Sequence, residues 1–366
     1  MKNTFGSSVS LTLFGESHGE AIGAVLDGIA PGIKIDEEYI AKKMQQRMPY
    51  GKISTARHEE DKVEIVCGVY GGFTTGTPIA LIIKNADMHS KDYAATRSLA
   101  RPGHADFTAY CKYHGFEDFR GGGHFSGRIT APVVAAGAIL LSALKDKGIY
   151  IGTHIKKCAG VSDRNFEDIK SDIIAVDNKV FSVLDPDKEN EMKSAIEIAA
   201  ENKDSVGGVL ETAVIGIPAG VGEPWFDSLE SMISHAVFGM PAVKGIEFGM
   251  GFGFADMTGS AANDPFVCEN GRISTSTNNN GGINGGISNG MPIIFRTAVK
   301  PTPSIFRQQN TVDFIKAENA EIELCGRHDP CIVHRASVVQ DSLTALVIAD
   351  MLSLRFGTDY LGNELA

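Results

Sequence analysis

The sequence APVVAAGAILLSAL, residues 131–144, is the most apolar stretch of the chain. Gly137 and Ser142 interrupt it, and it is shorter than the roughly 20 apolar residues that a membrane-spanning helix requires. We therefore predict a helix that is buried in the core of a soluble protein, and we expect no membrane partner.

On either side of this stretch, apolar residues recur at three- or four-residue spacing, which predicts helices, or in alternation, which predicts strands. The strands come in pairs or runs with helices interspersed, and this order favours an α+β architecture with antiparallel sheet. No Pro- or Ser-rich linker divides residues 1–366, which are long enough for one large domain or two ordinary ones. The predicted helices cover residues 36–47, 132–147, 189–203, 227–238 and 337–355, and the predicted strands cover residues 8–14, 62–69, 77–84, 208–217 and 291–298.

Composition and charge exclude several classes of function. A chain of 366 residues with 43% hydrophobic residues can bury a large core. It has 45 acidic and 34 basic residues and no basic run, so we expect no nucleic-acid partner. The N-terminal residues alternate like a strand and lack the apolar region of a signal peptide. With six cysteines and no C-x-x-C pair, the chain is expected to be cytoplasmic with reduced thiols.

A metal site is not expected. Zinc sites need Cys or His ligands clustered at short spacing, and the residues that come nearest to this are Cys325, His328, Cys331 and His334. Their three-residue intervals match zinc motifs poorly.

Several cations of this acidic chain lie beside Gly, His, Ser or Pro in segments that we interpret as loops. Loops that combine cations, backbone N–H groups and histidines suit a ligand with several negative charges. Because the net charge is -11, the cations must be gathered locally, and we expect a small ligand. They are Arg47, Lys52, Arg57, Arg101, Arg120, Arg128, Lys300, Arg307, Arg327 and Arg335.

Two histidines follow the same local design. His18 lies in GESHG, residues 15–19, after a predicted strand, and His104 lies in RPGHAD, residues 101–106. Imidazole titrates near neutrality, so either ring could protonate an anionic leaving group or a cofactor. Alternatively, each histidine only caps a backbone carbonyl in a polar turn. A serine hydrolase is less well supported, because G-x-S-x-G is absent and the adjacent positions of Ser17 and His18 rarely let one activate the other.

Three glycine-rich or charged loops complete the candidate site. Residues 121–123 are glycines between Arg120 and Arg128 and precede the apolar helix, as in an anion-binding nest at a helix N-terminus. The loop NNNGGINGG, residues 278–286, lets backbone approach a flat or phosphorylated ligand closely, or is a mobile surface loop. GRHDP, residues 326–330, combines a cation, a histidine and a carboxylate, or is an ion-paired turn.

These segments, together with VKGIEFG at residues 243–249 and KPTPS at residues 300–304, resemble the chorismate synthase family in order and spacing over the whole chain. The resemblance implies a homotetramer of single-domain subunits, each a β-α-β sandwich with antiparallel sheets and interior helices. It also implies reduced FMN as cofactor and 5-enolpyruvylshikimate 3-phosphate as substrate, which loses phosphate to give chorismate.

The resemblance assigns roles to individual residues. His18 resembles the histidine that protonates the departing phosphate, and His104 the one that protonates the flavin. Ser17 and Asp329 resemble a pair that relays a proton. The substrate or NADPH would contact Arg47, Lys52 and Arg57. FMN would be surrounded by His124, Phe125, Ser126, Arg128, Gly285, Lys300, Pro301, Thr302, Pro303, Ser304 and Arg327.

The chain departs from the common family pattern in two places. HFSGRIT at residues 124–130 replaces RSSARET, and Met48 replaces a second arginine. Two alternative functions would use the same loops. The protein would be a flavin reductase in which the histidines only pack, or a non-catalytic sensor of a phosphorylated metabolite. Whether NADPH reduces the flavin on this chain is left open by the sequence.

Overall fold

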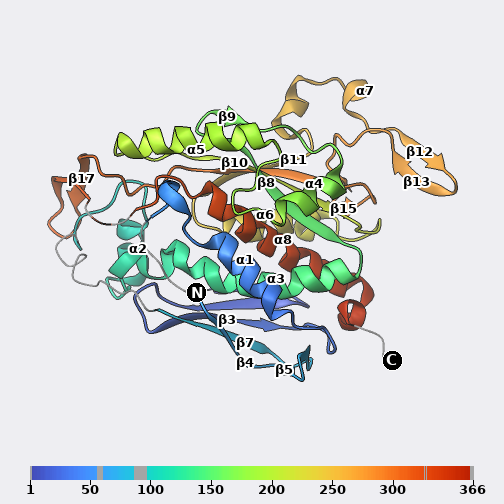
Figure 1. Ribbon diagram of the computed structural model, residues 1–366, viewed down its shortest axis with the longest axis horizontal. Helices are drawn as coiled ribbons and strands as arrows, with labels where there is room; N and C mark the ends of the chain where they lie inside the picture. Colours follow the sequence, from blue (N-terminus) through green and yellow to red (C-terminus); the bar gives the residue numbers. More distant parts are fainter. Residues whose placement is uncertain (1, 56–60, 86–96, 325, 327, 363–366) are drawn as a thin grey trace.

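The computed structural model describes residues 2–55, 61–85, 97–324, 326 and 328–362. Two five-stranded antiparallel sheets enclose a layer of helices (Figure 1). This arrangement confirms the α+β class and the β-α-β sandwich with interior helices. In spatial order, the first sheet is β1 (Thr4–Phe5), β2 (Ser10–Gly15), β3 (Ala21–Asp27), β7 (Ile79–Lys84) and β4 (Val63–Cys67), and the second is β11 (Val243–Phe248), β16 (Ile293–Val299), β10 (Gly208–Ile215), β8 (Tyr150–Cys158) and β9 (Val161–Ser162).

The interior layer consists of α1 (Glu37–Arg47), α3 (Thr130–Asp146), α6 (Leu229–Phe238) and α8 (Val333–Phe356). Nearly all of α3 is buried, as its sequence predicts. A Cβ on Gly137 of α3 would lie 2.2 Å from the Cβ of Ser342 on α8. Only glycine therefore allows the two helices to approach this closely, and the glycine that interrupts the apolar stretch is where α8 packs against it.

Polar side chains attach α8 to both sheets. Gln340 accepts a hydrogen bond from Thr297 at 2.5 Å and donates one to Thr212 at 2.7 Å, which links the helix to β16 and β10. At the other end of the helix, the buried Asp350 carboxylate accepts the backbone N–H groups of residues 7–9 at 2.7–3.0 Å, next to β2. Buried polar groups that are fully paired in this way fix how the layers are arranged.

By length and composition alone, Gly127–Asp146 and α8 could each cross a membrane. Most residues of both segments are buried between the two sheets. They are core helices of the sandwich.

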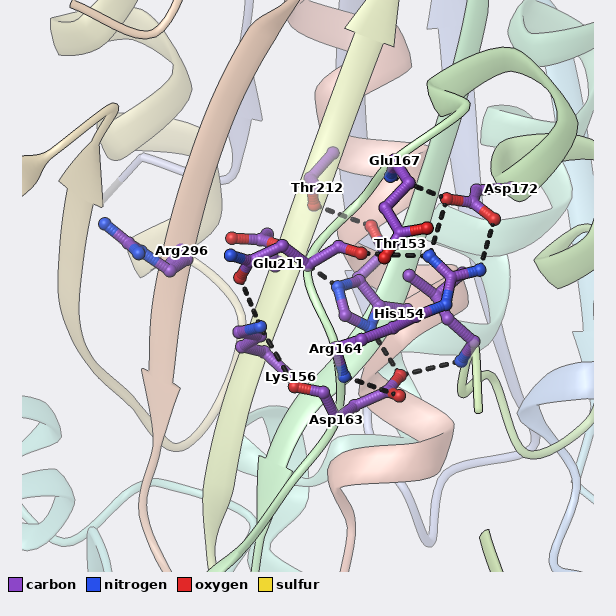
Figure 2. Close-up of polar contacts among 12 residues, drawn as sticks. Thr153, His154, Lys156, Asp163, Arg164, Glu167, Asp172, Glu211, Thr212 and Arg296 are labelled. Atoms are coloured by element: carbon purple, nitrogen blue, oxygen red, sulfur yellow. Dashed lines mark hydrogen bonds and ion pairs between the residues drawn. The ribbon is translucent and has the colours of Figure 1, made fainter. Parts of the chain in front are cut away.

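The outer face of the second sheet carries a polar network rather than an apolar one (Figure 2). His154 on β8 is fully buried between two carboxylates, with Nδ1 2.9 Å from Asp163 and Nε2 3.0 Å from Glu211. Asp163 also accepts the backbone N–H groups of Leu184 and Asp185 at the start of α5 (Pro186–Glu201), the helix that lies over this sheet in Figure 1. His154 is therefore a structural histidine that fixes α5 on the sheet.

The predicted helices and strands are all present, with ends that shift by a few residues, but several elements were not predicted. The strands that the sequence did not predict include β3 and β8, which contain Gly, Ala, His or Lys in place of a regular apolar alternation. The further elements are α2 (Asp106–Tyr113), α4 (Ile169–Val176), α7 (Gly259–Ala262), and the strand pairs β5 (Val69–Tyr70) with β6 (Phe73–Thr74), β12 (Phe266–Glu269) with β13 (Arg272–Thr275), β14 (Ile283–Asn284) with β15 (Ile287–Ser288), and β17 (Gln309–Asp313) with β18 (Glu318–Ile322).

Candidate active site

A cavity of about 940 Å³ lies where α3 and α8 begin and α6 ends. Its wall combines the turns that precede α2, α3 and α8 with residues 300–304 that follow β16. Helix N-termini carry a partial positive charge, so the starts of α3 and α8 favour an anion in this cavity.

The cavity collects many of the cations that the sequence singled out. Arg47, Arg101, Arg128, Lys300 and Arg335 all line it. The carboxylates in the lining are Asp61 and Asp329, so the wall carries an excess of positive charge in an acidic protein. The sequence also missed Lys2 and Lys244, which line the cavity too.

Other predicted cations lie elsewhere. Lys52 is exposed and is not part of the lining. Arg120 pairs with Asp118 at 2.7 Å, and Arg307 pairs with Asp204 at 3.1 Å. Arg57 and Arg327 lie outside the residues that the structure describes.

Arg47 and Arg128 share one buried carboxylate. Arg47 Nη1 lies 2.8 Å from Asp61 Oδ2, and Arg128 Nη1 contacts Asp61 Oδ1. Asn85 accepts from Arg128 Nε at 3.0 Å, and its amide donates to the Glu16 and Gly19 carbonyls of the GESHG turn. Asp61 and Asn85 thus fix two guanidinium groups at the cavity wall, and nothing in the local sequence of either residue indicated this.

His104 lines the cavity and contacts Asp106, which is not part of the lining. Its Nδ1 lies 2.9 Å from Asp106 Oδ1, and Arg101 binds both oxygens of the same carboxylate at 2.6 and 2.8 Å. Burial raises the pKa of the Asp106 carboxyl, but hydrogen bonds from Arg101 and His104 outweigh it and hold that pKa well below its usual range. Asp106 is therefore ionised at neutral pH.

His18 is buried, at 5% exposure, and is not part of the cavity lining. The glycine turn at residues 121–123 folds over it: a Cβ on Gly121 would lie 2.1 Å from His18 Cε1. The next residue, Gly122, lies beside His104, and an added Cβ would lie 3.3 Å from Nε2. These consecutive glycines provide the space for both histidine rings.

Ser17 and His18 interact although they are adjacent in sequence. Ser17 Oγ lies 3.0 Å from His18 Nδ1 and 3.2 Å from the carbonyl oxygens of Arg120 and Gly121. The hydroxyl can donate to one carbonyl while it accepts the His18 Nδ1–H. Ser17 is fully buried, so this contact orients the ring and does not present a nucleophile.

Asp329 lines the cavity just before the start of α8. It accepts the Thr55 backbone N–H at 2.9 Å and pairs with Arg335 at 2.8 Å. Arg335 also donates to the Arg47 carbonyl at 2.7 Å. The contacts of Ser17 and of Asp329 thus belong to different parts of the site.

Most of the expected cofactor residues line the same cavity: His124, Phe125, Ser126, Arg128, Lys300, Thr302, Pro303 and Ser304. Pro301 is exposed beside them. Gly285 lies between β14 and β15 and is not part of the lining. Lys300 Nζ donates to the Gly103 carbonyl, which joins residues 300–304 to the His104 turn.

The lining fits a cofactor with a flat apolar ring and a charged tail. Besides the cations, the lining has an apolar part that includes Phe5, Leu13, Val133, Phe238 and Leu343. The Thr302 Oγ1 atom is buried in the wall without a hydrogen-bond partner. A buried hydroxyl left unpaired is costly, so it marks a position where a bound ligand supplies the partner.

His235 is a further histidine of the lining. It lies near the end of α6 and packs edge-on against Phe5, with ring centroids 5.1 Å apart.

The cavity suits a small polyanion, His104 lines it, and one glycine turn lies against both His104 and the buried His18. Comparison with known proteins makes this specific. Residues 9–353 match the sequence profile of the chorismate synthase family. The chain belongs to the chorismate synthase family.

Curated relatives and a solved structure agree over nearly the full length. The chain is 45% identical to a chorismate synthase of Thermococcus gammatolerans, covering 96% of this chain and 97% of that one. It is 47% identical to one of Campylobacter fetus, covering 96% of each. A crystal structure of chorismate synthase superimposes with a TM-score of 0.76 at 30% identity, covering 97% of this chain and 94% of the other.

Proposed function

We propose that this protein is a carbon–oxygen lyase that converts 5-enolpyruvylshikimate 3-phosphate to chorismate, a step of the shikimate pathway for aromatic amino acid biosynthesis. Family membership over the whole chain supports the reaction. The single observation that carries the assignment to this cavity is that its lining includes Arg47, Arg128, Lys300, Arg335 and His104. The substrate has two carboxylates and a phosphate, and charge-assisted hydrogen bonds to such groups are strong where water is excluded.

We propose reduced FMN as the cofactor. When bound, it supplies the electron density that the elimination needs, because the hydrogen lost from C6 is poorly acidic. Residues 124–126, Arg128, residues 300–304 and, by resemblance, Gly285 and Arg327 would hold it. The unpaired Thr302 hydroxyl and the apolar wall support this placement. NADPH is a candidate reductant, with Arg47, Lys52 and Arg57 as its proposed contacts.

The histidines would act as acids. His104 faces the cavity and would protonate the cofactor, while His18, against Gly121 at the cavity wall, would protonate the departing phosphate. Ser17 would support His18 through the contact between Oγ and Nδ1. Asp329 would accept a proton at the start of α8, where Arg335 and the Thr55 N–H hold its carboxylate.

We also propose that the chain is a single domain that assembles as a cytoplasmic homotetramer. One hydrophobic core runs through both sheets and the interior helices, which supports a single domain. Large apolar side chains at the surface support assembly, because such patches mark protein contacts. They include Trp225, Phe226, Phe252, Phe266 and Ile273, each at least 65% exposed.

An anaerobic assay tests the proposed activity. Purified protein is mixed with 5-enolpyruvylshikimate 3-phosphate and chemically reduced FMN, and chorismate absorbance is followed. We expect turnover. Binding of both ligands without product would instead identify a sensor of the phosphorylated metabolite. Repeating the assay with oxidised FMN and NADPH shows whether the chain reduces its own cofactor.

A further inference from the structure

The Asp106 carboxylate lies behind His104 and does not line the cavity itself. It contacts two other side chains of the same turn: Arg101 donates to both of its oxygens, and His104 Nδ1 lies 2.9 Å from Oδ1. Arg101 Nη2 also lies 3.1 Å from His104 Nδ1. These distances allow two arrangements of the proton on the ring, since Nδ1 can donate to the carboxylate or accept from the guanidinium.

The charges decide between the two arrangements. An ionised carboxylate accepts hydrogen bonds and cannot donate them. If Nδ1 lacked a proton, its lone pair would face an oxygen lone pair of Asp106 at 2.9 Å, which is repulsive. With a proton on Nδ1, the contact becomes a charge-assisted hydrogen bond, and Arg101 keeps its two bonds to Asp106.

We propose that Asp106 is a positioning residue that holds His104 with its proton on Nδ1, so that Nε2 is the atom that exchanges a proton with a ligand in the cavity. The other side of the ring supports this. Gly122 has no side chain beside Nε2 and Cε1, and an added Cβ would lie 3.3 and 3.2 Å from them. The glycine thus leaves space beside Nε2 that a side chain would fill.

The groups around His104 keep the arrangement local. Arg101 and Asp106 are on its own turn, and Lys300 contacts that turn through the Gly103 carbonyl. Loss of the Asp106 charge would leave the Arg101 guanidinium without its anionic partner beside the imidazole and would remove the charged acceptor that favours a proton on Nδ1.

The proposal rests on the proposed function for its catalytic consequence, but the proton position can be measured without turnover. Histidine labelled with 15N and 13C reports the tautomer and titration of each ring by NMR in the ligand-free protein. The His104 signal is identified by its loss in His104→Gln. We expect the Nδ1–H form in the wild type at neutral pH, although free imidazole favours Nε2–H. A wild-type His104 in the Nε2–H form would overturn the proposal whether or not any variant folds.

Variants then test the role of the carboxylate. In Asp106→Asn we expect the Nδ1–H form of His104 to lose population to the Nε2–H form. We expect kcat to fall about 10- to 100-fold, the range for carboxylates that orient metal-bound histidines, while KM changes less than about 3-fold. Asp106→Glu should recover part of kcat. An unchanged ratio of the two His104 tautomers in folded Asp106→Asn would refute the role.

Asp172→Asn is the matched control. Asp172 binds both Nη atoms of Arg164 at 2.6 and 2.9 Å, so it makes the same kind of ion pair, but it lies outside the cavity lining. We expect normal kcat and an unchanged His104 signal in this variant. If the wild type makes no chorismate, the proposed function fails, while the NMR measurement still tests whether Asp106 sets the proton position.

Discussion

Gly121→Ala tests directly whether the glycine turn positions His18. Gly121 has φ +58°, in the left-handed region, where a side chain costs about 1–2 kcal/mol. The added Cβ would lie 2.1 Å from His18 Cε1 and 2.7 Å from Ser17 Oγ. Carbon atoms pack at about 3.5–4.0 Å, so the ring must move by about 1.4 Å or more. Overpacking adds about 1–3 kcal/mol.

Gly71→Ala is the matched control. Gly71, between β5 and β6, has φ +59°, and an added Cβ would have no neighbour within 4 Å. It therefore has the backbone strain without the clash. We expect Gly71→Ala to lose about 1–2 kcal/mol of unfolding free energy and to keep the turnover of the wild type. Gly121→Ala should lose about 2–5 kcal/mol and, because a misplacement of about 1 Å can cost 10²-fold, about 10²-fold or more in turnover.

Urea unfolding and anaerobic turnover, measured on the same preparations of both variants, separate these effects. Equal losses of stability in the two variants, together with wild-type turnover in Gly121→Ala, would refute the reasoning. The ring would then not depend on the missing side chain, and the position of His18 would not limit the reaction.

Three further changes test other parts of the site. Thr302→Val removes a buried hydroxyl without a partner, so the ligand-free protein should gain about 1 kcal/mol of unfolding free energy, while FMN binding weakens about 5- to 10-fold. A melting curve and an FMN titration measure the two effects. A lower stability with unchanged FMN binding would contradict the assignment. Asp329→Asn should keep FMN affinity and lose turnover sharply; a lower melting temperature with full turnover would instead make Asp329 only the partner of Arg335. Lys43 contacts both Asp177 and Asp341. Burial raises the pKa of Asp341 from 3.8 to about 7, so its protonated form stabilises the fold at low pH, and that contribution is lost as the pH rises from about 4 to about 7. The wild type should therefore lose unfolding free energy over this pH range, relative to Asp341→Asn. Urea unfolding of both proteins at several pH values tests this, and a difference in unfolding free energy that does not change with pH would reject the pKa shift.

The sequence predicted the elements with strong periodicity and missed those shaped by close contacts. The helix at residues 132–147 was predicted because an apolar run of that length must be buried, and α3 confirms it. β3 was not predicted, because its small residues reflect packing: a Cβ on Gly23 would lie 2.2 Å from the Phe14 ring. A residue that is small because of a neighbour in space carries no periodic signal.

The site shows the same limit. Motif resemblance predicted His104, Arg47 and residues 302–304, and the structure brings these residues to one cavity. It did not predict Asp61, whose role depends on two arginines that are 14 and 67 residues away in the sequence. Nor did it predict that Gly121 faces His18, a contact between segments about a hundred residues apart, which only the fold reveals.

The central claim is that this cavity eliminates phosphate from its substrate without net oxidation or reduction. The most direct test mixes excess 5-enolpyruvylshikimate 3-phosphate anaerobically with a limiting amount of reduced FMN and the protein, and measures chorismate, free phosphate and flavin absorbance together. We predict that chorismate and phosphate appear in equal amounts, with many turnovers per flavin, and that the flavin ends in its reduced form. Flavin oxidised in proportion to product, with no phosphate released, would contradict the claim and identify a reductase.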